Sequence, residues 1–273
     1  MNIDWNAVWC TAMQRATFVG NGAEFWTNWQ QSLSEKPANT SGYVKQMLKR
    51  IRVSPQASVL DVGAGTGALA LPLAATANYV TALDQSLTML QAIASKTAEN
   101  EIDNIRLVQA DWTKARLGID FAQHDVVLVS RSLPGEDDLR RSLRLINDTA
   151  RHYCYITVKA DGYDALEAKL CEYLQIDYYA LPEYSILHKL LHSMGIYANI
   201  EFFNASSKRY YNNLREARCD IVRSYPLAAA DYTRVEEFIA GQLVNDQNGY
   251  RKDINTTWAL LWWEKSTGDN LKL

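Results

Sequence analysis

Short hydrophobic runs alternate with stretches of helical periodicity between about residues 57 and 158. The apolar runs are short and continuous, as in strands buried on both faces, and the stretches between them have the spacing of amphipathic helices. Strands are predicted at Ser58–Val62, Tyr79–Leu83, Ile105–Gln109, Asp125–Val129 and Tyr153–Val158, with helices at Gly67–Ala75, Ser86–Glu99 and Asp137–Ala150. This alternation predicts a parallel sheet covered by helices on both faces.

The pattern becomes less regular after residue 160. Two further strands are predicted at Tyr197–Phe203 and Thr256–Glu264, and helices at Gly162–Leu174, Glu183–Met194, Ser207–Ser224 and Asp231–Leu243. These helices outnumber what the sheet needs, so some are expected to form a cap. The predicted fold is α/β: a doubly wound, mostly parallel sheet of seven strands with an antiparallel C-terminal edge strand, plus N-terminal helices and a helical cap insertion.

Four parts of one structural domain are expected. They are an N-terminal helical lid segment (1–50), an α/β core (51–160), a helical cap (161–245) with one sheet strand near 197–203, and a last strand with its tail (246–273). Seven of the eight tryptophans lie in the first 29 or the last 16 residues. Two aromatic ends that meet would form either a lid over a pocket or a packing cluster, and both interpretations stay open.

The candidate chemistry begins where the first strand ends. The run from Asp61 through Gly63, Ala64, Gly65, Thr66 and Gly67 leads from that strand into a helix. Glycines allow a tight turn and a close approach of the backbone to a ligand, and a helix start offers unpaired N–H groups. This arrangement predicts a nucleotide or nucleoside site.

Two cofactor classes compete for this loop. Gly63, Gly65 and Ala68 fit the loose dinucleotide pattern, and Asp84 follows about 20 residues later, where an acid binds a ribose. Asp61, however, would lie badly beside a pyrophosphate and well beside a cationic amino acid group. Asp111 ends the third strand and can accept a hydrogen bond from an adenine amino group, with Trp112 beside the ring. The three acids favour S-adenosylmethionine.

The segment from about 45 to 160 resembles the class I S-adenosylmethionine-dependent methyltransferases. Val59 to Gly67 is similar to their first motif, Ala82 to Leu90 to the second, Asp111-Trp112 to the third and Asp125 to Ser130 to the fourth. Within that class the chain looks closest to the quinone-biosynthesis-like small-molecule subgroup.

The resemblance implies a role for each matching position. Asp61 would orient waters or the methionine amino group, and Gly63 and Gly65 would pass under the cofactor. Asp84 would hold the ribose hydroxyls with Gln85 beside it, and Asp111 the adenine. Ser130 and Arg131 would face the methionine end and the acceptor.

No catalytic base stands out in the sequence. The residues expected to line the methyl-transfer site are Arg131, Tyr43, Trp26 and Trp258, since aromatic faces can stabilise a sulfonium. His188 and His192 share a helix face, but no glutamate follows the first histidine as in zinc proteases, so no metal is predicted. The strand before Arg131 lacks the N/D-P-P-Y/F tetrad of methyltransferases that act on bases.

Composition narrows the class of partner. The net charge is −3 and the pI is near 5.9, so no nucleic-acid partner is expected. The four cysteines have no metal or redox spacing, and no signal peptide or membrane span is recognisable. The chain is expected to be cytoplasmic, a monomer or homodimer, and to act on a small molecule. Two alternatives remain: a non-catalytic S-adenosylmethionine sensor or scaffold, and a dinucleotide-dependent oxidoreductase.

Overall fold

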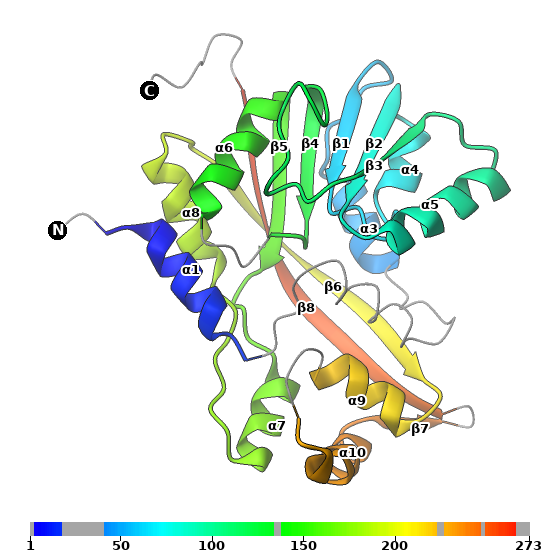
Figure 1. Ribbon diagram of the computed structural model, residues 1–273, viewed down its shortest axis with the longest axis vertical. Helices are drawn as coiled ribbons and strands as arrows, with labels where there is room; N and C mark the ends of the chain where they lie inside the picture. Colours follow the sequence, from blue (N-terminus) through cyan, green and yellow to red (C-terminus); the bar gives the residue numbers. More distant parts are fainter. Residues whose placement is uncertain (1–2, 18–40, 134–137, 223–226, 247–248, 266–273) are drawn as a thin grey trace.

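The centre of the molecule is a sheet whose first five strands are parallel (Figure 1). The computed structural model describes residues 3–17, 41–133, 138–222, 227–246 and 249–265. The five strands lie in the order β3-β2-β1-β4-β5. They are β1 (Ser58–Val62), β2 (Tyr79–Asp84), β3 (Ile105–Gln109), β4 (His124–Ser130) and β5 (Ala150–Lys159). All five were predicted, and the boundaries of β3 agree to the residue.

Two long strands continue the sheet beyond β5. The C-terminal strand β8 (Gly249–Glu264) is antiparallel to β5, and β6 (Asn199–Tyr211) is antiparallel to β8. A short strand β7 (Val244–Asp246) pairs with the far end of β8, which makes eight strands where seven were predicted. The C-terminal strand is antiparallel as expected, but β6 and not β8 forms the edge of the sheet.

The predicted helix at Ser207–Ser224 is wrong in its first part. Strand β6 runs on to Tyr211 because each of these residues pairs with the equally extended β8, as Ser207 does with Ile254 and Tyr211 with Tyr250. The ladder satisfies the backbone, and the helix α9 begins only at Leu214.

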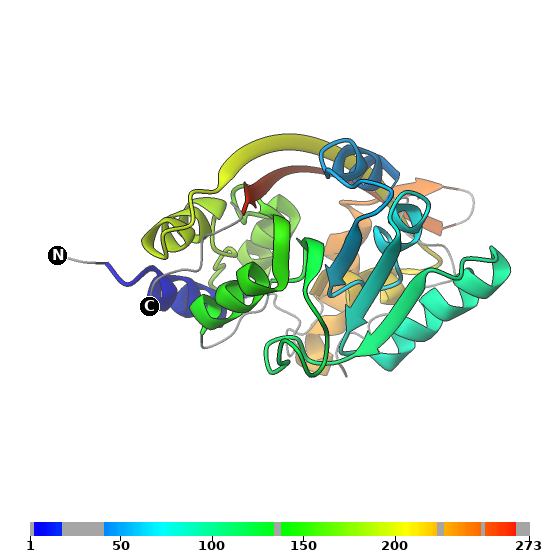
Figure 2. The same cartoon turned by 90° about the horizontal axis from the view of Figure 1, so that it is seen from above.

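Helices cover both faces of the sheet. On one face lie α1 (Trp5–Arg15), α6 (Leu139–Thr149) and α8 (Tyr184–Ser193), and on the other α3 (Ser41–Leu48), α4 (Ala70–Ala74) and α5 (Leu87–Glu99). Figure 2 shows α1, α6 and α8 gathered together. Successive strand residues point to opposite faces, so Leu60 packs in the cluster with Leu143 of α6, whereas Val59 packs with Met47 of α3.

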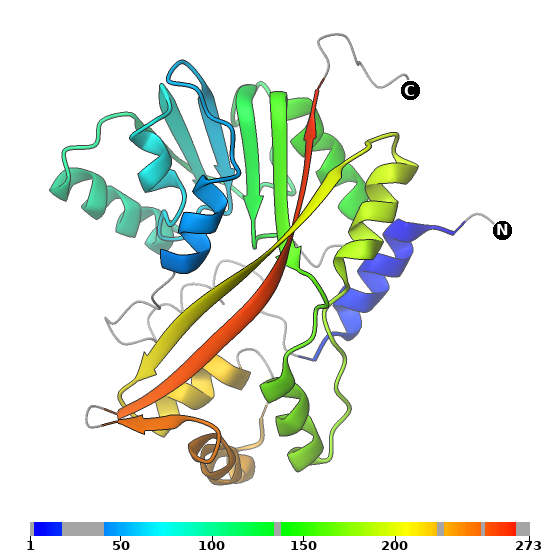
Figure 3. The same cartoon turned by 180° about the vertical axis from the view of Figure 1, so that it is seen from behind.

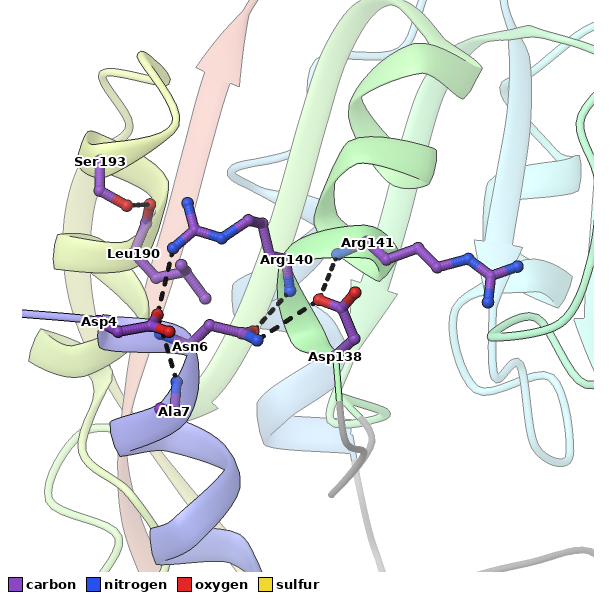
Figure 4. A network of polar contacts seen from close by, with 8 residues as sticks. All are labelled: Asp4, Asn6, Ala7, Asp138, Arg140, Arg141, Leu190 and Ser193. Atoms are coloured by element: carbon purple, nitrogen blue, oxygen red, sulfur yellow. Dashed lines mark hydrogen bonds and ion pairs between the residues drawn. The ribbon is translucent and has the colours of Figure 1, made fainter.

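A polar network fixes α1 to the start of α6 (Figure 4). Asp4 caps α1 by accepting from the N–H of Asn6 at 3.0 Å, and it pairs with Arg140 at 3.4 Å. The Asn6 side chain in turn accepts from the Arg140 N–H at 2.8 Å. The two described helices of the predicted lid segment 1–50 therefore lie on opposite faces of the sheet, and a lid role for this segment stays a prediction.

The cap is carried on the far halves of β6 and β8 (Figures 1 and 3). Its helices are α7 (Ala165–Leu174), α9 (Leu214–Val222) and α10 (Tyr232–Ala240), with a 3₁₀ turn at Ala229–Asp231. They share a separate hydrophobic cluster that includes Leu170, Ile221 and Ile239. The buried Asp220 accepts from Arg209 and, at 2.6 Å, from the Tyr211 hydroxyl, which ties α9 to β6.

Candidate functional site

The loop that leaves β1 turns at three glycines with left-handed backbones. Gly63, Gly65 and Gly67 have φ values of 67°, 55° and 81°. The N–H groups of Gly63 and Ala64 donate to the Leu83 carbonyl at 2.8 and 3.0 Å, which ties the loop to the end of β2. The helix expected from Gly67 begins only at Ala70, because turns occupy the residues between.

The three glycines serve different purposes. A Cβ on Gly63 would lie 2.4 Å from the Cβ of Ser132, and one on Gly67 would lie 3.0 Å from Leu71, so both positions are filled by the protein's own packing. A Cβ on Gly65 would meet no atom within 4 Å. Gly65 is therefore the glycine whose surroundings leave room for a ligand.

Asp84 ends β2 and faces the glycine loop. One carboxylate oxygen accepts from the Gly65 N–H at 2.8 Å, and the other accepts from the Ser86 N–H at 2.9 Å. Burial raises the pKa of Asp84, although these N–H bonds oppose the change. Each oxygen keeps further lone pairs, so the carboxylate can also accept from a ligand. Ser86 caps α5 as predicted, with its hydroxyl 3.4 Å from the Met89 N–H.

Asp61 lies inside the end of β1 with only 2% of its surface exposed. Burial raises its pKa to about 7, and the negative charge of Asp84 adds to this, while the Ala70 N–H and Arg131 oppose it. A carboxylate with this pKa gains most from a cationic partner, because a positive charge restores its ionised form.

The third acid is engaged within its own turn. Asp111 accepts from the Thr113 hydroxyl at 2.5 Å and pairs with Lys114 at 2.8 Å. Partial burial favours a higher pKa, but the hydrogen bonds from Lys114 and Thr113 outweigh it and lower the pKa of Asp111. Trp112 is 8% exposed and packs in the core with Phe121 and Ile146. Contacts of either residue with an adenine remain predictions.

A buried tyrosine joins the ends of β4 and β5. The Tyr43 hydroxyl lies 2.7 Å from Ser130 Oγ and 2.6 Å from Thr157 Oγ1. Helix α3 brings Tyr43 here by packing closely on β6, where a Cβ on Gly42 would lie 2.9 Å from the Ser206 carbonyl oxygen. Burial raises the pKa of Tyr43, so the phenol stays protonated at neutral pH.

Arg131 and two aromatic rings complete this edge of the sheet. The Arg131 guanidinium carbon lies 4.2 Å from the ring centre of Tyr43 and 5.9 Å from that of Trp258. The Tyr43 and Trp258 rings meet edge-on at 5.1 Å. Arg131 has φ 60°, which is uncommon for a residue with a side chain, and its N–H donates to the Thr157 carbonyl at 3.3 Å. Three predicted lining residues from distant parts of the chain thus meet.

Two further predicted positions form hydrogen bonds within the protein. The Thr66 carbonyl accepts from Lys96 Nζ at 3.0 Å, and the Gln85 carbonyl accepts from the Gln109 side chain at 3.4 Å. Trp26 lies outside the described residues. Sequence reasoning missed Thr157, although a polar residue inside a buried apolar strand could have indicated it. It also missed Phe203, whose ring centre lies 5.7 Å from that of Tyr43.

The described residues offer neither a metal site nor a membrane-spanning helix. No group of three histidine, cysteine or carboxylate side chains gathers there in a way that suits a metal ion. No helix in the same ranges combines the length and hydropathy that a bilayer crossing requires.

Comparison with known families identifies the segment that holds most of these residues. Residues 59–152 match a family described as "Methyltransferase domain". The match begins in β1 and ends in β5, so it contains the glycine loop and all three acids.

Two curated relatives differ in how much of the chain they cover. An uncharacterized protein of Haemophilus influenzae is 28% identical over 85% of this chain and 84% of its own length. A 23S rRNA (uracil(1939)-C(5))-methyltransferase of Aeromonas salmonicida is 34% identical, but over 36% of this chain and 23% of its own length. The second match therefore concerns one part of a much longer protein.

Solved structures share the fold at low sequence identity. The YcgJ protein of Bacillus subtilis superposes with a TM-score of 0.56 and 16% identity, over 82% of this chain and 98% of that one. Magnesium protoporphyrin IX methyltransferase of Synechocystis, solved with bound SAH, gives a TM-score of 0.51 and 12% identity over 94% and 99%. The resemblance to class I methyltransferases is confirmed, while the quinone-biosynthesis-like subgroup stays a prediction.

Proposed function

We propose that this chain, whose residues 59–152 match a methyltransferase domain, transfers a methyl group from S-adenosylmethionine to a small molecule held beside Tyr43, Arg131 and Trp258. The observation that carries this proposal is that these three residues meet at the carboxyl ends of β4 and β5. Strand β4 pairs with β1, the strand that leads into the glycine loop. Ligands of open α/β sheets bind at this edge.

The cofactor half of the site, which we define as the glycine loop with Asp61, Asp84 and Asp111, fits S-adenosylmethionine. The room above Gly65 accommodates a close ligand, and the free lone pairs of Asp84 suit two ribose hydroxyls. The raised pKa of Asp61 suits the ammonium group of the methionine moiety. Gln85 is proposed to lie beside Asp84 at the ribose, and Asp111 and Trp112 on the adenine side.

The acceptor half of the site, which we define as Tyr43, Ser130, Arg131, Thr157 and Trp258, would orient the molecule that is methylated. When bound, S-adenosylmethionine supplies an electrophilic methyl group on a sulfonium. The methyl group passes from the sulfonium to the acceptor, and a neutral thioether leaves. The transfer therefore needs alignment and exclusion of water, and a general base only where the acceptor atom carries a proton. Tyr43 fixes the Ser130 hydroxyl through a 2.7 Å hydrogen bond, and the Tyr43 and Trp258 rings supply apolar walls.

Several observations favour a small molecule over a nucleic acid. The net charge of −3 offers little attraction for a polyanion. The arginines of α6 are partly used within the protein, since Arg140 pairs with Asp4. The match to rRNA methyltransferases covers 36% of the chain, and an RNA acceptor is therefore included in the test.

The test is transfer of a labelled methyl group from S-adenosylmethionine into a cell extract. The extract is divided by size into a metabolite fraction, a protein fraction and an RNA fraction before the enzyme is added. The proposal expects label in the metabolite fraction, dependent on the enzyme and lost in Trp258→Ala. Label in RNA alone would overturn the small-molecule acceptor, and S-adenosylmethionine binding without transfer to any fraction would favour a sensor or scaffold.

A further inference from the structure

The acceptor half of the site carries an exposed positive charge. Arg131 directly follows β4, and its side chain lies over the ring of Tyr43 at 4.2 Å. No ion pair links it to a carboxylate of any other residue in the described ranges. A guanidinium stacked on a ring loses little freedom when it binds, because its plane is already oriented.

The ring contacts of the Arg131 side chain belong to the acceptor half. The two rings that it contacts belong to α3 and β8, whereas the glycine loop follows β1. In the sheet β4 and β5 lie between β1 and β8. The guanidinium therefore lies over rings of the acceptor half, although its charge also reaches Asp61 and opposes the rise of that carboxyl's pKa.

Other charges at this edge are balanced. Lys159 lies opposite Trp258 in the ladder, and its ammonium group pairs with Asp164 at 3.5 Å. Asp164 also feels the charge of Lys252. Arg131, by contrast, has no acidic partner within ion-pair distance among the described residues.

From this geometry, and resting on the proposed function, we propose that the acceptor is a small organic acid whose carboxylate binds Arg131. A planar guanidinium matches a carboxylate with two parallel hydrogen bonds. A cationic amine is the less suitable acceptor, because Arg131 repels it and already covers the Tyr43 ring that would otherwise attract it. Trp258 would pack against the apolar part of the acid.

The binding test uses a matched pair of probes, 4-fluorobenzoate and 4-fluorobenzamide, followed by fluorine NMR with S-adenosylhomocysteine present. The two differ in charge and little in shape. The benzoate is expected to bind at least tenfold more tightly than the benzamide, and Arg131→Gln should abolish this preference while Arg131→Lys restores part of it. Arg141→Gln is the control, since Arg141 is exposed on α6 and points away from its polar neighbours in Figure 4.

Equal binding of the two probes to the native chain would overturn the proposal, as would an unchanged preference in Arg131→Gln. A second measurement excludes a role in holding the cofactor's own carboxylate. Arg131→Gln should bind S-adenosylhomocysteine within threefold of the native affinity. If it instead loses S-adenosylhomocysteine but keeps 5′-methylthioadenosine, which lacks the amino acid group, Arg131 serves the cofactor and the proposal falls.

Turnover separates this inference from the proposed function. The metabolite fraction is divided on an anion exchanger, and each part is given to the enzyme with labelled S-adenosylmethionine. Acceptor activity is expected in the retained, anionic part and should fall at least tenfold in Arg131→Gln. Activity in the unretained part alone would contradict the organic acid but leave the small-molecule methyltransferase standing. Label in RNA alone would contradict both.

Discussion

The cofactor half and the acceptor half of the site are built in opposite ways. In the cofactor half the functional residues lie at or just beyond the ends of successive strands, and backbone groups hold the loop and Asp84: Gly63 donates to Leu83, and Asp84 accepts from Gly65 and Ser86. In the acceptor half, Tyr43, Arg131 and Trp258 come from α3, the end of β4 and β8, and side-chain contacts bring them together.

This difference separates binding from transfer. Backbone hydrogen bonds make the cofactor half nearly independent of the cap and the N-terminal helices, so changes there should act on cofactor affinity. The acceptor half depends on how α3 and β8 pack, so changes there should leave cofactor affinity intact and lower the rate of transfer. Substitutions in the two halves test whether cofactor affinity and the rate of transfer are separable in this way.

The largest expected effect is on stability, at Asp61. The pKa of Asp61 rises from 3.8 to about 7 in the folded chain, so its ionisation opposes folding. This cost is absent near pH 4, grows as the pH rises to about 7 and is then constant. Asp61→Asn should therefore raise the free energy of unfolding of the ligand-free protein by up to about 4 kcal/mol at pH 8.

Urea unfolding at pH 4 and pH 8 measures this effect. If the free energies of unfolding of variant and native protein differ equally at both pH values, the ionisation of Asp61 is not the cause. The same variant should bind S-adenosylmethionine more weakly at pH 8. The native affinity should also fall as the pH drops below about 7, where Asp61 becomes protonated, while the affinity of the variant stays flat.

The second effect is on cofactor affinity, at Asp84. Asp84→Ala should weaken S-adenosylhomocysteine binding at least roughly a hundredfold, and it should cost about 1–3 kcal/mol of stability because two N–H groups lose their acceptor. Asp125→Ala is the matched control, since Asp125 also accepts from a backbone N–H, that of Ser58 at 2.8 Å, near the opposite end of β4. The control should lose stability alone, and a similar loss of affinity in both variants would remove the ribose role.

The third effect distinguishes two glycines with similar surroundings in the free protein. Gly65 and Gly118 have φ values of 55° and 83°, and a Cβ on either would meet no atom within 4 Å. Alanine at each should cost about 1–2 kcal/mol of stability from the left-handed backbone. Calorimetric titration should show a loss of affinity on the order of tenfold or more for Gly65→Ala only. Full affinity in Gly65→Ala would mean that the cofactor does not pass this glycine.

The smallest expected effect on binding or transfer belongs to the acceptor half. Tyr43→Phe removes the hydroxyl that bridges Ser130 and Thr157, and it should cost about 1–3 kcal/mol, since Thr157 is fully buried. The rate of methyl transfer should fall several-fold while S-adenosylhomocysteine affinity stays within twofold. A drop in affinity instead of rate would show that the two halves are not separate.

The same contrast explains which site residues could be predicted from the sequence. Asp61, Asp84 and Asp111 were predicted together because the ends of parallel strands meet at one edge, which is a property of the fold class. Tyr43, Arg131 and Trp258 were named only as candidates, because no short-range pattern requires them to meet. Thr157 and Phe203 were missed for the same reason: their partner Tyr43 lies more than 100 residues away in the chain.

The long antiparallel ladder between β6 and β8 shows where secondary structure could not be predicted from the sequence. Residues after Phe203 are polar and have no strong alternation, so a helix was a reasonable prediction. The strand forms there because Ser207 to Tyr211 pair with Ile254 to Tyr250, and this pairing is a tertiary contact that local preference does not contain.

Calorimetric titration of the native chain shows which class of cofactor the cofactor half binds. S-adenosylhomocysteine and NAD⁺ are titrated separately, because both suit a glycine loop followed by an acid at the next strand end. S-adenosylhomocysteine is expected to bind at one site per chain, and NAD⁺ is expected to give no saturable heat. Saturable binding of NAD⁺ with none of S-adenosylhomocysteine would contradict the assignment of the cofactor half.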